Sequence, residues 1–479
     1  MKRFPKGSKT AFACILIAAA AVGSFQIGHN SRESYHQAYT LLSSRSKISR
    51  LEFMSAYQPN AQVTDLGERA SGLDLGSMET FYRVLRAIRE NYVERIETTQ
   101  EKDMAYGALR GMLQSLNDAN SRFLEPAQYD VVKDQMDGKF HGIGAVLAMR
   151  RIKEGSREIT RLIVVTTMPG SPAEKAGLKA GDSIAYLDGK WVISYDPYAE
   201  VNKLAKLVRS NLADRSALAR AYEAAEKKLS NATTAGKVAD ALTADVRKDF
   251  SLTVWRPGEK MPLRVKVSTE DTIVAPTSHR LLADGVGYLH VEFFTDGSAE
   301  KIAAALSDLA AQGATKLVLD LRGCPGGSQD AAMKAAAQIA PDQVLGLLLK
   351  AHGKEEILKL GKPENTTTWN RIVVLVDGST AGVAEMVAAG LRDSARATLV
   401  GEATFGDAKH QILVMQKDGS AVVFTDGEYV TPKRQKFDEK GVSVSVKAPP
   451  TDGKEDSALG KALEILTATT PMIAEAPHA

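Results

Sequence analysis

The sequence predicts a layered α/β domain in its second half, preceded by a β-rich segment and by a helical region. Three observations support this order. After Pro276, apolar β-branched runs alternate with helical patterns, as in a sheet with parallel pairing. Between Gly142 and Val267, short β-branched runs are separated by turns that contain Gly and Pro. From Ser77 to Leu116, apolar residues recur at helical spacing.

Composition sets the scale and excludes several classes of function. The 479 residues, 44% of them hydrophobic, are enough for about three domains of ordinary size. Sixty-one Lys and Arg against 58 Asp and Glu leave a net charge of +3, which argues against a dedicated nucleic-acid binder. The eight histidines and two cysteines show no metal-ligand spacing, and no phosphate-binding loop is present. We therefore expect no metal and no cofactor.

The N-terminus has the pattern of an export signal. Basic residues precede an apolar stretch from Ala11 to Gly23, as in a secretory signal peptide. The stretch is shorter than the roughly 20 residues of a membrane-spanning helix, although Phe25 and Ile27 can extend it into an uncleaved anchor. Cleavage and retention both remain open. We assign residues 1–28 to this segment and residues 29–76 to a polar tether.

Residues 77–136 are expected to form an N-terminal helical region. The first helix opens at Ser77 and carries one apolar face, formed by Phe81, Leu85, Ile88 and Tyr92. A second helix is expected from a capping box at Thr98 and Glu101 to Leu116, packed against the first. Local reasoning predicts only a loop for residues 115–126.

Residues 137–270 have the order of elements of a small β domain. Gly142 to Ala145 leads into a first strand. A turn and a short helix span Pro169 to Gly177, and an Asp-Gly turn closes at Gly189. The further strands are expected at Leu162–Thr166, in the run before Gly189, at Phe250–Arg256 and at Pro262–Val267.

This order resembles a PDZ domain, and the resemblance assigns its carboxylate-binding loop to Gly142, Ile143, Gly144 and Ala145. Residues at about 211–249, rich in Ala, Lys, Glu and Leu, depart from the PDZ pattern and predict a helical hairpin inserted in the domain. The hairpin either decorates the surface or forms a docking or oligomerisation surface.

The alternating elements of the α/β core occupy residues 271–450, followed by a C-terminal helix and tail at 451–479. Expected strands are Gly285–Val291, Lys316–Leu321, Arg371–Val376 and Thr398–Val400, and expected helices are Ala299–Ala311, Gln329–Ile339 and Ala384–Arg392.

Four ordered motifs within this core resemble the carboxyl-terminal processing, or tail-specific, peptidases of family S41. They are Lys316 to Gly327, Val373 to Ala388, Val400 to Gln411 and Gly427 to Pro432. The resemblance implies a layered core of the ClpP/crotonase type. It also implies hydrolysis of peptide bonds by a serine nucleophile and a lysine base, with an oxyanion loop at Gly326, Gly327 and Val383.

The two catalytic positions hold the wrong residues. Glu385 matches the glutamate three residues after the family's serine, which places the nucleophile position at Gly382. The family's Phe-Gly-Lys motif falls on Phe405, Gly406 and Asp407, while Gln411 retains the later glutamine. Glycine has no oxygen with which to attack. A carboxyl with an ordinary pKa of about 3.9 does not replace a lysine amine tuned down from about 10.4.

Nearby residues carry other groups that could serve as nucleophile and base. Thr380 lies two residues before the nucleophile position and Lys409 two after the base position, and along an extended strand a shift of two keeps the same face. Ser379 with His410 is a second hydroxyl and base, and Cys324 lies in the oxyanion loop. None has the spacing of the family.

The sequence therefore predicts an exported pseudopeptidase of the bacterial cell envelope, periplasmic or extracytoplasmic. Its expected partners are protein or peptide C-termini, bound by the PDZ loop, together with an active peptidase relative or further copies of itself. An active serine- or threonine-type endopeptidase with a displaced dyad is the first alternative. An oligomeric scaffold is the second.

Overall fold

The computed structural model describes residues 61–63, 76–116, 118, 120–154, 157–210, 214–244, 247–363, 366–448 and 456–468. The export signal and nearly all of the tether lie outside these residues. No helix among the described residues is long and apolar enough to cross a membrane.

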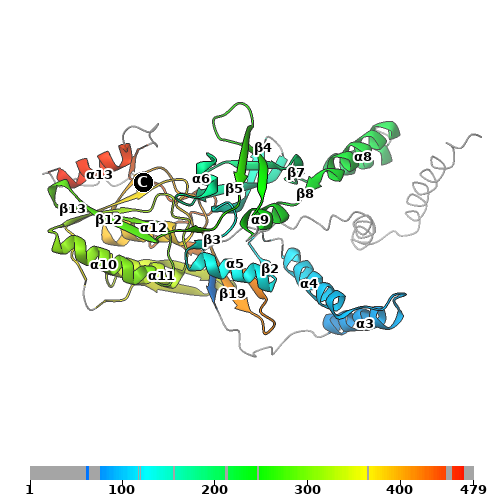
Figure 1. Ribbon diagram of the computed structural model, residues 1–479, viewed down its shortest axis with the longest axis horizontal. Helices are drawn as coiled ribbons and strands as arrows, with labels where there is room; N and C mark the ends of the chain where they lie inside the picture. The colour runs from blue at the N-terminus through cyan, green and yellow to red at the C-terminus, as the bar shows by residue number, and fades with distance from the viewer. Residues whose placement is uncertain are drawn as a thin grey trace, which may run out of the picture. The chain divides into compact units, whose positions relative to one another are not determined.

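The core contains a six-stranded sheet in which all pairs except one are parallel (Figure 1). Its strand order is β12-β13-β14-β17-β18-β21, and only β12 and β13 run antiparallel. The strands are β12 (Thr277–Leu282), β13 (Val286–Val291), β14 (Lys316–Asp320), β17 (Arg371–Val376), β18 (Thr398–Gly401) and β21 (Val446–Lys447). The predicted alternation of strands and helices in the core is confirmed.

Helices cover both faces of this sheet. One face packs on α10 (Ser298–Ala311), α11 (Gln329–Ile339) and α12 (Val383–Ala395) in a single apolar cluster. The other face packs on α13 (Ser457–Thr467). Because both faces are covered, the central strands are continuous apolar runs, such as Val373 to Val376, rather than alternating ones.

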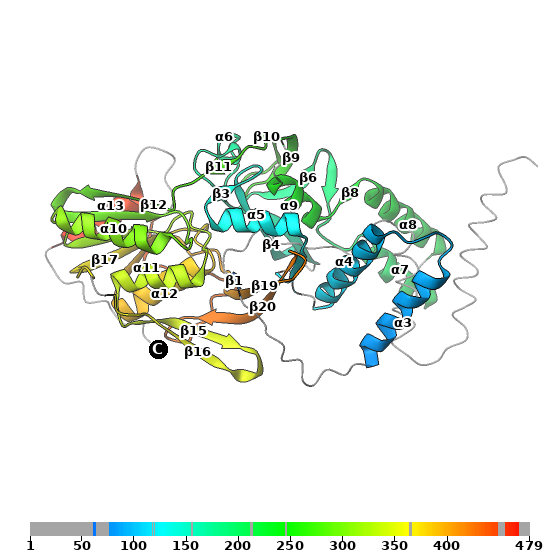
Figure 2. The same cartoon turned by 60° about the horizontal axis from the view of Figure 1, so that its bottom comes forward.

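A second sheet closes the far side of the helices α11 and α12 (Figure 2). Its order is β1-β19-β20-β15-β16, and β2 pairs with β20. The strands are β1 (Ala61–Val63), β2 (Arg122–Leu124), β15 (Val344–Lys350), β16 (Glu355–Lys359), β19 (Lys409–Met415) and β20 (Ala421–Val430). The loop expected at residues 115–126 is wrong in part, because Arg122 to Leu124 are buried and pair with β20.

The inserted domain, here called the insert domain, contains a seven-stranded sheet of order β10-β9-β6-β5-β4. A short parallel pair, β7 and β8, continues from β6. The strands are β4 (Ala145–Glu154), β5 (Arg157–Thr167), β6 (Ser183–Leu187), β7 (Lys190–Val192), β8 (Ala232–Thr233), β9 (Asp249–Trp255) and β10 (Leu263–Ser268). Its helices α6 (Pro172–Lys175) and α9 (Ala235–Thr243) complete the domain's own apolar cluster.

The predicted bounds of the helical hairpin, about 211–249, are wrong. The hairpin consists of α7 (Ala199–Arg209) and α8 (Arg215–Ser230), so it begins earlier. Tyr198 and Tyr222 pack between its two arms with ring centroids 5.9 Å apart. The third helix, α9, belongs instead to the core of the insert domain, since Val238 and Leu242 are fully buried there. Tertiary burial, which local composition does not report, separates α9 from the hairpin.

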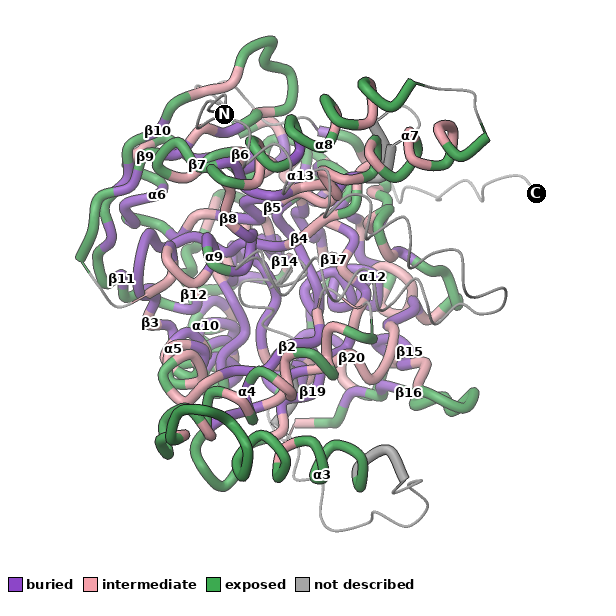
Figure 3. Tube along the Cα trace, turned by 90° about the vertical axis from the view of Figure 1, so that its right-hand side faces the viewer, coloured by how far each residue is buried: buried purple, intermediate pink, exposed green. Residues whose placement is uncertain are grey.

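The N-terminal helices α3 (Gly76–Asn91) and α4 (Thr98–Ser115) occur where expected, with two corrections. The capping interaction is one residue earlier, because Glu97 N–H donates to Gln100 Oε1 at 2.9 Å. The expected packing of the two helices is wrong for α3, most of which is exposed (Figure 3). Phe81 and Ile88 on this helix and Tyr92 just after it are all exposed. Only α4 packs well, through Tyr106 against Phe123 of β2.

Candidate functional site

The nucleophile position lies in the turn between β17 and α12. The carboxylate of Asp377, at the end of β17, accepts hydrogen bonds from Ser379 N at 2.9 Å and Thr380 N at 3.0 Å. It also accepts one from Gly323 N, 3.1 Å away in the loop after β14. Burial raises the pKa of Asp377 and these backbone donors oppose the rise. Asp377 thus ties two loops together, a role that the sequence analysis missed, although an aspartate directly after a buried strand was a usable signal.

Gly382 forms a sharp turn before α12, with φ of 57° and ψ of −127°. This positive φ favours glycine, and α12 begins at the next residue, Val383. A side chain here would stand at the N-terminal end of a buried helix, where backbone N–H groups collect. The position therefore has the geometry of a nucleophile elbow and no nucleophile.

Glu385 joins the two predicted catalytic positions. Its buried Oε2 accepts from Gly382 N at 2.9 Å and from Asp407 N at 2.7 Å. Its Oε1 accepts from Gly406 N at 2.7 Å and from the hydroxyl of Thr404. Because one oxygen binds both main-chain groups, Gly382 and Asp407 are neighbours in space. Burial raises the pKa of Glu385 to about 8, against the effect of these donors.

Asp407 presents a half-buried carboxyl at the position of the family's base. Its Oδ1 accepts a hydrogen bond from Lys409 N, at 3.3 Å. Burial raises the pKa of Asp407 to about 7, and the nearby carboxylates of Asp438 and Asp118 add to the rise. A carboxyl is present, but Gly382 offers no hydroxyl proton for it to accept.

The displaced pair, Thr380 and Lys409, is engaged elsewhere. Thr380 is fully buried in the turn, not on an extended strand, and its hydroxyl donates to Leu321 O at 2.8 Å. The two-residue periodicity of a strand therefore does not apply to it. Lys409 Nζ lies 2.8 Å from Asp438 Oδ2. Burial lowers the pKa of Lys409, but the surrounding carboxylates, with Asp438 the largest contributor among them, together outweigh burial and the net shift is upward, away from that of a general base.

The other displaced groups are also buried. His410 is fully buried, with Nδ1 bound to Asp426 and its ring edge-on to Tyr429 at 5.5 Å between centroids. Cys324 is fully buried, and burial raises the pKa of its thiol far above the usual range. A thiol in this state is a poor nucleophile. Ser379 is buried in the same turn as Thr380.

The predicted oxyanion loop keeps a backbone that requires glycine. Gly326 and Gly327 have φ of 103° and 135°, and a Cβ on Gly327 would lie 2.1 Å from Phe294 O. The loop is joined to the nucleophile turn by a hydrogen bond from Ala381 N to Cys324 O of 2.9 Å. The Cys324 sulfur lies against this loop, 3.9 Å from Gly326 O, and a hydrogen bond with the Gly326 backbone opposes the rise in the pKa of its thiol. Gln411 is buried on β19, beside the base loop.

A face of the insert domain packs on this site. Val146 and Ala148 of β4 share an apolar cluster with Ala381, the residue before the nucleophile position. The guanidinium of Arg150 stacks over the ring of Phe405 at 4.8 Å and donates to Glu439 O at 2.8 Å. The insert domain therefore contacts both the nucleophile turn and the base loop.

The predicted carboxylate-binding loop of the insert domain packs tightly on α9. Gly142 and Gly144 have positive φ, of 77° and 67°. A Cβ on Gly142 would lie 2.0 Å from Leu242 O, and Ile143 N–H donates to the same oxygen at 2.8 Å. Ala145 then opens β4, which is an edge strand of the insert domain's sheet. The loop thus leads directly into a strand edge that has no partner strand among the described residues.

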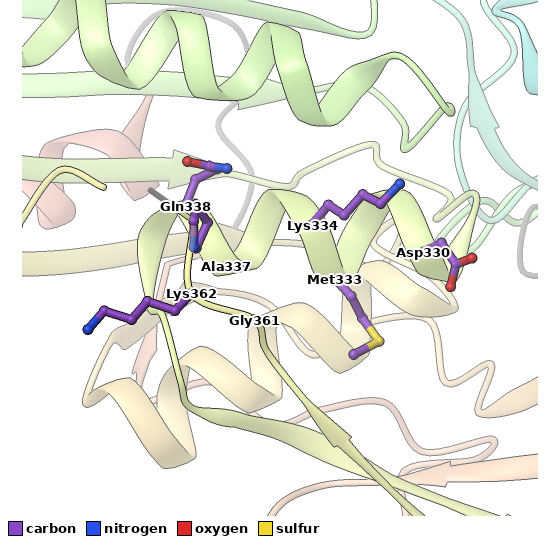
Figure 4. Close-up of a pocket in the computed structure, with 8 residues that line it drawn as sticks. Asp330, Met333, Lys334, Ala337, Gln338, Gly361 and Lys362 are labelled. Atoms are coloured by element: carbon purple, nitrogen blue, oxygen red, sulfur yellow. The ribbon is translucent and has the colours of Figure 1, made fainter. Parts of the chain in front are cut away.

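Other parts of the core offer no competing catalytic centre among the described residues. A pocket of about 390 Å³ opens between α11 and residues 361–363, lined among others by Asp330, Met333 and Lys334 (Figure 4). It contains none of the predicted site residues and no nucleophile paired with a base. In the described part of the chain, no group of His, Cys, Asp and Glu side chains has the arrangement of a metal site.

Comparison with known proteins identifies the family of the chain. The model of peptidase family S41 matches residues 285–448. The chain is 30% identical over 359 residues to a carboxyl-terminal-processing protease of Picosynechococcus sp., covering 74% of this chain and 75% of that protein. It is 27% identical over 387 residues to the carboxy-terminal processing protease CtpA of Bacillus subtilis, covering 80% and 71%. A photosystem II D1 C-terminal processing protease has a similar fold, with a TM-score of 0.57, 24% identity and coverage of 82% of this chain and 98% of that one. The chain therefore belongs to peptidase family S41, among the carboxyl-terminal processing proteases.

Proposed function

We propose that this protein binds protein C-termini and does not cleave them. In this proposal the insert domain is a PDZ domain whose loop, Gly142 to Ala145, receives the terminal carboxylate. We infer the loss of cleavage from the hydrogen bonds of Glu385 to Gly382 and Asp407, here called the Glu385 clamp. It holds Gly382 and Asp407 side by side at the two catalytic positions, where neither the hydroxyl nor the amine is present.

Peptide capture is supported by the free edge of β4. Gly144 O accepts from Met168 N, and Ala145 pairs with Thr167 across the sheet. In an antiparallel ladder this pattern turns the N–H and C=O of Ala145 toward the outer edge. An extended peptide can add there as a further strand, with its C-terminus at the glycine loop. The relatives are processing proteases that act at C-termini according to their names, so the proposed ligand keeps their substrate class.

Binding is tested with the full-length chain and a fluorescent peptide carrying either a free or an amidated C-terminus. We expect preference for the free carboxylate and a loss of at least about tenfold in affinity for Gly142→Ala, whose Cβ meets backbone. Gly170→Ala is the matched control. Its φ is 72°, but a Cβ there meets nothing within 4 Å, so affinity should be unchanged. Equal binding of both peptides would reject capture of C-termini and favour the scaffold alternative.

Cleavage is tested by incubating the chain with an unstructured protein. We expect no turnover. The alternative, an active peptidase with a displaced dyad, predicts cleavage that disappears in Thr380→Ala or Lys409→Ala. That result would overturn the pseudopeptidase proposal without affecting the binding test. Export, by a cleaved signal or by a retained anchor, forms part of the proposal because of the pattern at residues 1–28.

A further inference from the structure

Two linkers connect the insert domain to the core, and they pair with each other. The incoming chain leaves α5 (Pro126–Met136) through β3 (Lys139–Phe140), and the outgoing chain returns through β11 (Thr272–Ile273). The two strands form a separate antiparallel ribbon, with Thr272 opposite Phe140 and Ile273 opposite Lys139 (Figure 2). A ribbon of two strands is marginally stable by itself, so side-chain contacts must hold it.

One buried histidine supplies such a contact. His141 follows β3 and is only 3% exposed. Its Nε2 lies 2.7 Å from Asp134 Oδ2 on α5, and its Nδ1 lies 2.7 Å from Asp271 Oδ1 on the outgoing linker. The ring therefore bridges α5 and the outgoing linker.

The bridge requires a particular charge. Ionised carboxylates only accept hydrogen bonds, so both ring nitrogens must donate, and only the imidazolium form has two N–H groups. A neutral ring, itself buried, would turn a lone pair toward one of the two carboxylates. We propose that His141 is a proton-dependent lock on the hinge of the insert domain, closed when the ring is charged and loosened when it is neutral.

The surrounding charges agree with this assignment. Burial lowers the pKa of His141, but the hydrogen bonds to Asp134 and Asp271 outweigh it and the net shift is upward. The hydrogen bond to His141 lowers the pKa of Asp134 in turn. The cation beside them, Lys139, lies 3.1 Å from Asp134 and only partly opposes the charge on the ring. The lock is thus complete below the ordinary histidine pKa of about 6.5 and is lost as the pH rises through the higher folded value.

Loss of the His141 bridge would directly affect the glycine loop, Gly142 to Ala145. Gly142 follows His141 directly, and its carbonyl accepts from Glu270 N, beside Asp271, at 2.7 Å. Release of Asp271 therefore loosens the loop on one side. This inference rests on the hinge geometry and not on the proposed function.

Hydrogen–deuterium exchange of the full-length chain between pH 5.5 and 8.5 tests the lock. The reporters are the amides of Glu270 and Val274, both bonded across the hinge, each compared with amides of β14 in the same molecule to cancel intrinsic rates. We expect relative protection to fall about tenfold per pH unit between the open- and closed-state pKa values. His141→Gln should abolish this dependence. His279→Gln, which removes an exposed histidine 2.9 Å from Asp308 on the core, should preserve it.

A second variant keeps the test decisive if His141→Gln fails to fold. Asp271→Asn leaves an acceptor for the ring and removes one negative charge, so the transition should move to lower pH by about one unit. A flat profile in the wild type would overturn the proposal. So would an unchanged profile in His141→Gln or in Asp271→Asn.

Discussion

The predicted catalytic site of the core and the glycine loop of the insert domain are held together by different means. At the core, one buried carboxylate, Glu385, gathers four donors from α12 and the base loop. At the insert domain, Gly142 lies directly against the backbone of α9, where there is no room for a side chain. The difference shows that the framework around Glu385 is built without the side chains of residues 382 and 407, because the donors from these residues are backbone N–H groups. In the glycine loop, by contrast, the residues whose backbone contacts fix the shape of the loop are the same residues that would bind the ligand.

The largest effect should follow from removal of the clamp. Glu385→Ala leaves three backbone N–H groups and the Thr404 hydroxyl without their acceptor in a buried site. We expect a loss of about 4 kcal/mol in the free energy of unfolding, measured by urea denaturation. Glu300→Ala on the exposed face of α10 is the control and should change stability by less than about 0.5 kcal/mol. A small loss for Glu385→Ala would show that the two catalytic positions are not held by this residue.

A second experiment restores the serine and the lysine at the two predicted catalytic positions. If the framework is intact, Gly382→Ser with Asp407→Lys should gain peptide hydrolysis of about a hundredfold over the wild-type background. Either single change should stay at background, because the two groups act as a unit. The serine at positive φ should cost about 2 kcal/mol of stability. Absence of cleavage in the folded double variant would mean that the surrounding framework also lacks the geometry that catalysis needs.

The smallest effect concerns pH. The pKa of Asp407 is raised to about 7 in the folded chain, so the folded state retains a proton that the unfolded state releases. Stability should therefore fall as the pH rises from about 4 to 7. Asp407→Asn should reduce this slope in thermal unfolding measured at several pH values.

A neighbouring carboxylate provides the control for this pH effect. Asp438→Asn removes one of the negative charges that raise the pKa of Asp407 but leaves the Asp407 carboxyl in place. The fall in stability should therefore end at a lower pH and be smaller, but it should not disappear. An equal slope in the wild type and in Asp407→Asn would show that other groups carry the pH dependence.

Most of the core was predictable because its signals are local. The limits of α11 and β17 match the expected ranges, since buried apolar runs and helical periodicity are properties of short segments. The larger failures involve distant contacts. The burial of β2 and the separation of α9 from the hairpin each depend on what a segment packs against, whereas the cap of α4 is local and was misplaced by one residue.

The residues at the two predicted catalytic positions can be read from the sequence alone, because a glycine at 382 and an aspartate at 407 are covalent facts that no fold can change. The tertiary structure decided where those positions lie, through a glutamate oxygen shared by Gly382 and Asp407. It also decided that Thr380 and Lys409 are engaged with other partners. The hinge histidine is the clearest case, since His141 and Asp271 are 130 residues apart in sequence. Only folding brings such groups within hydrogen-bonding distance, and no local pattern records it.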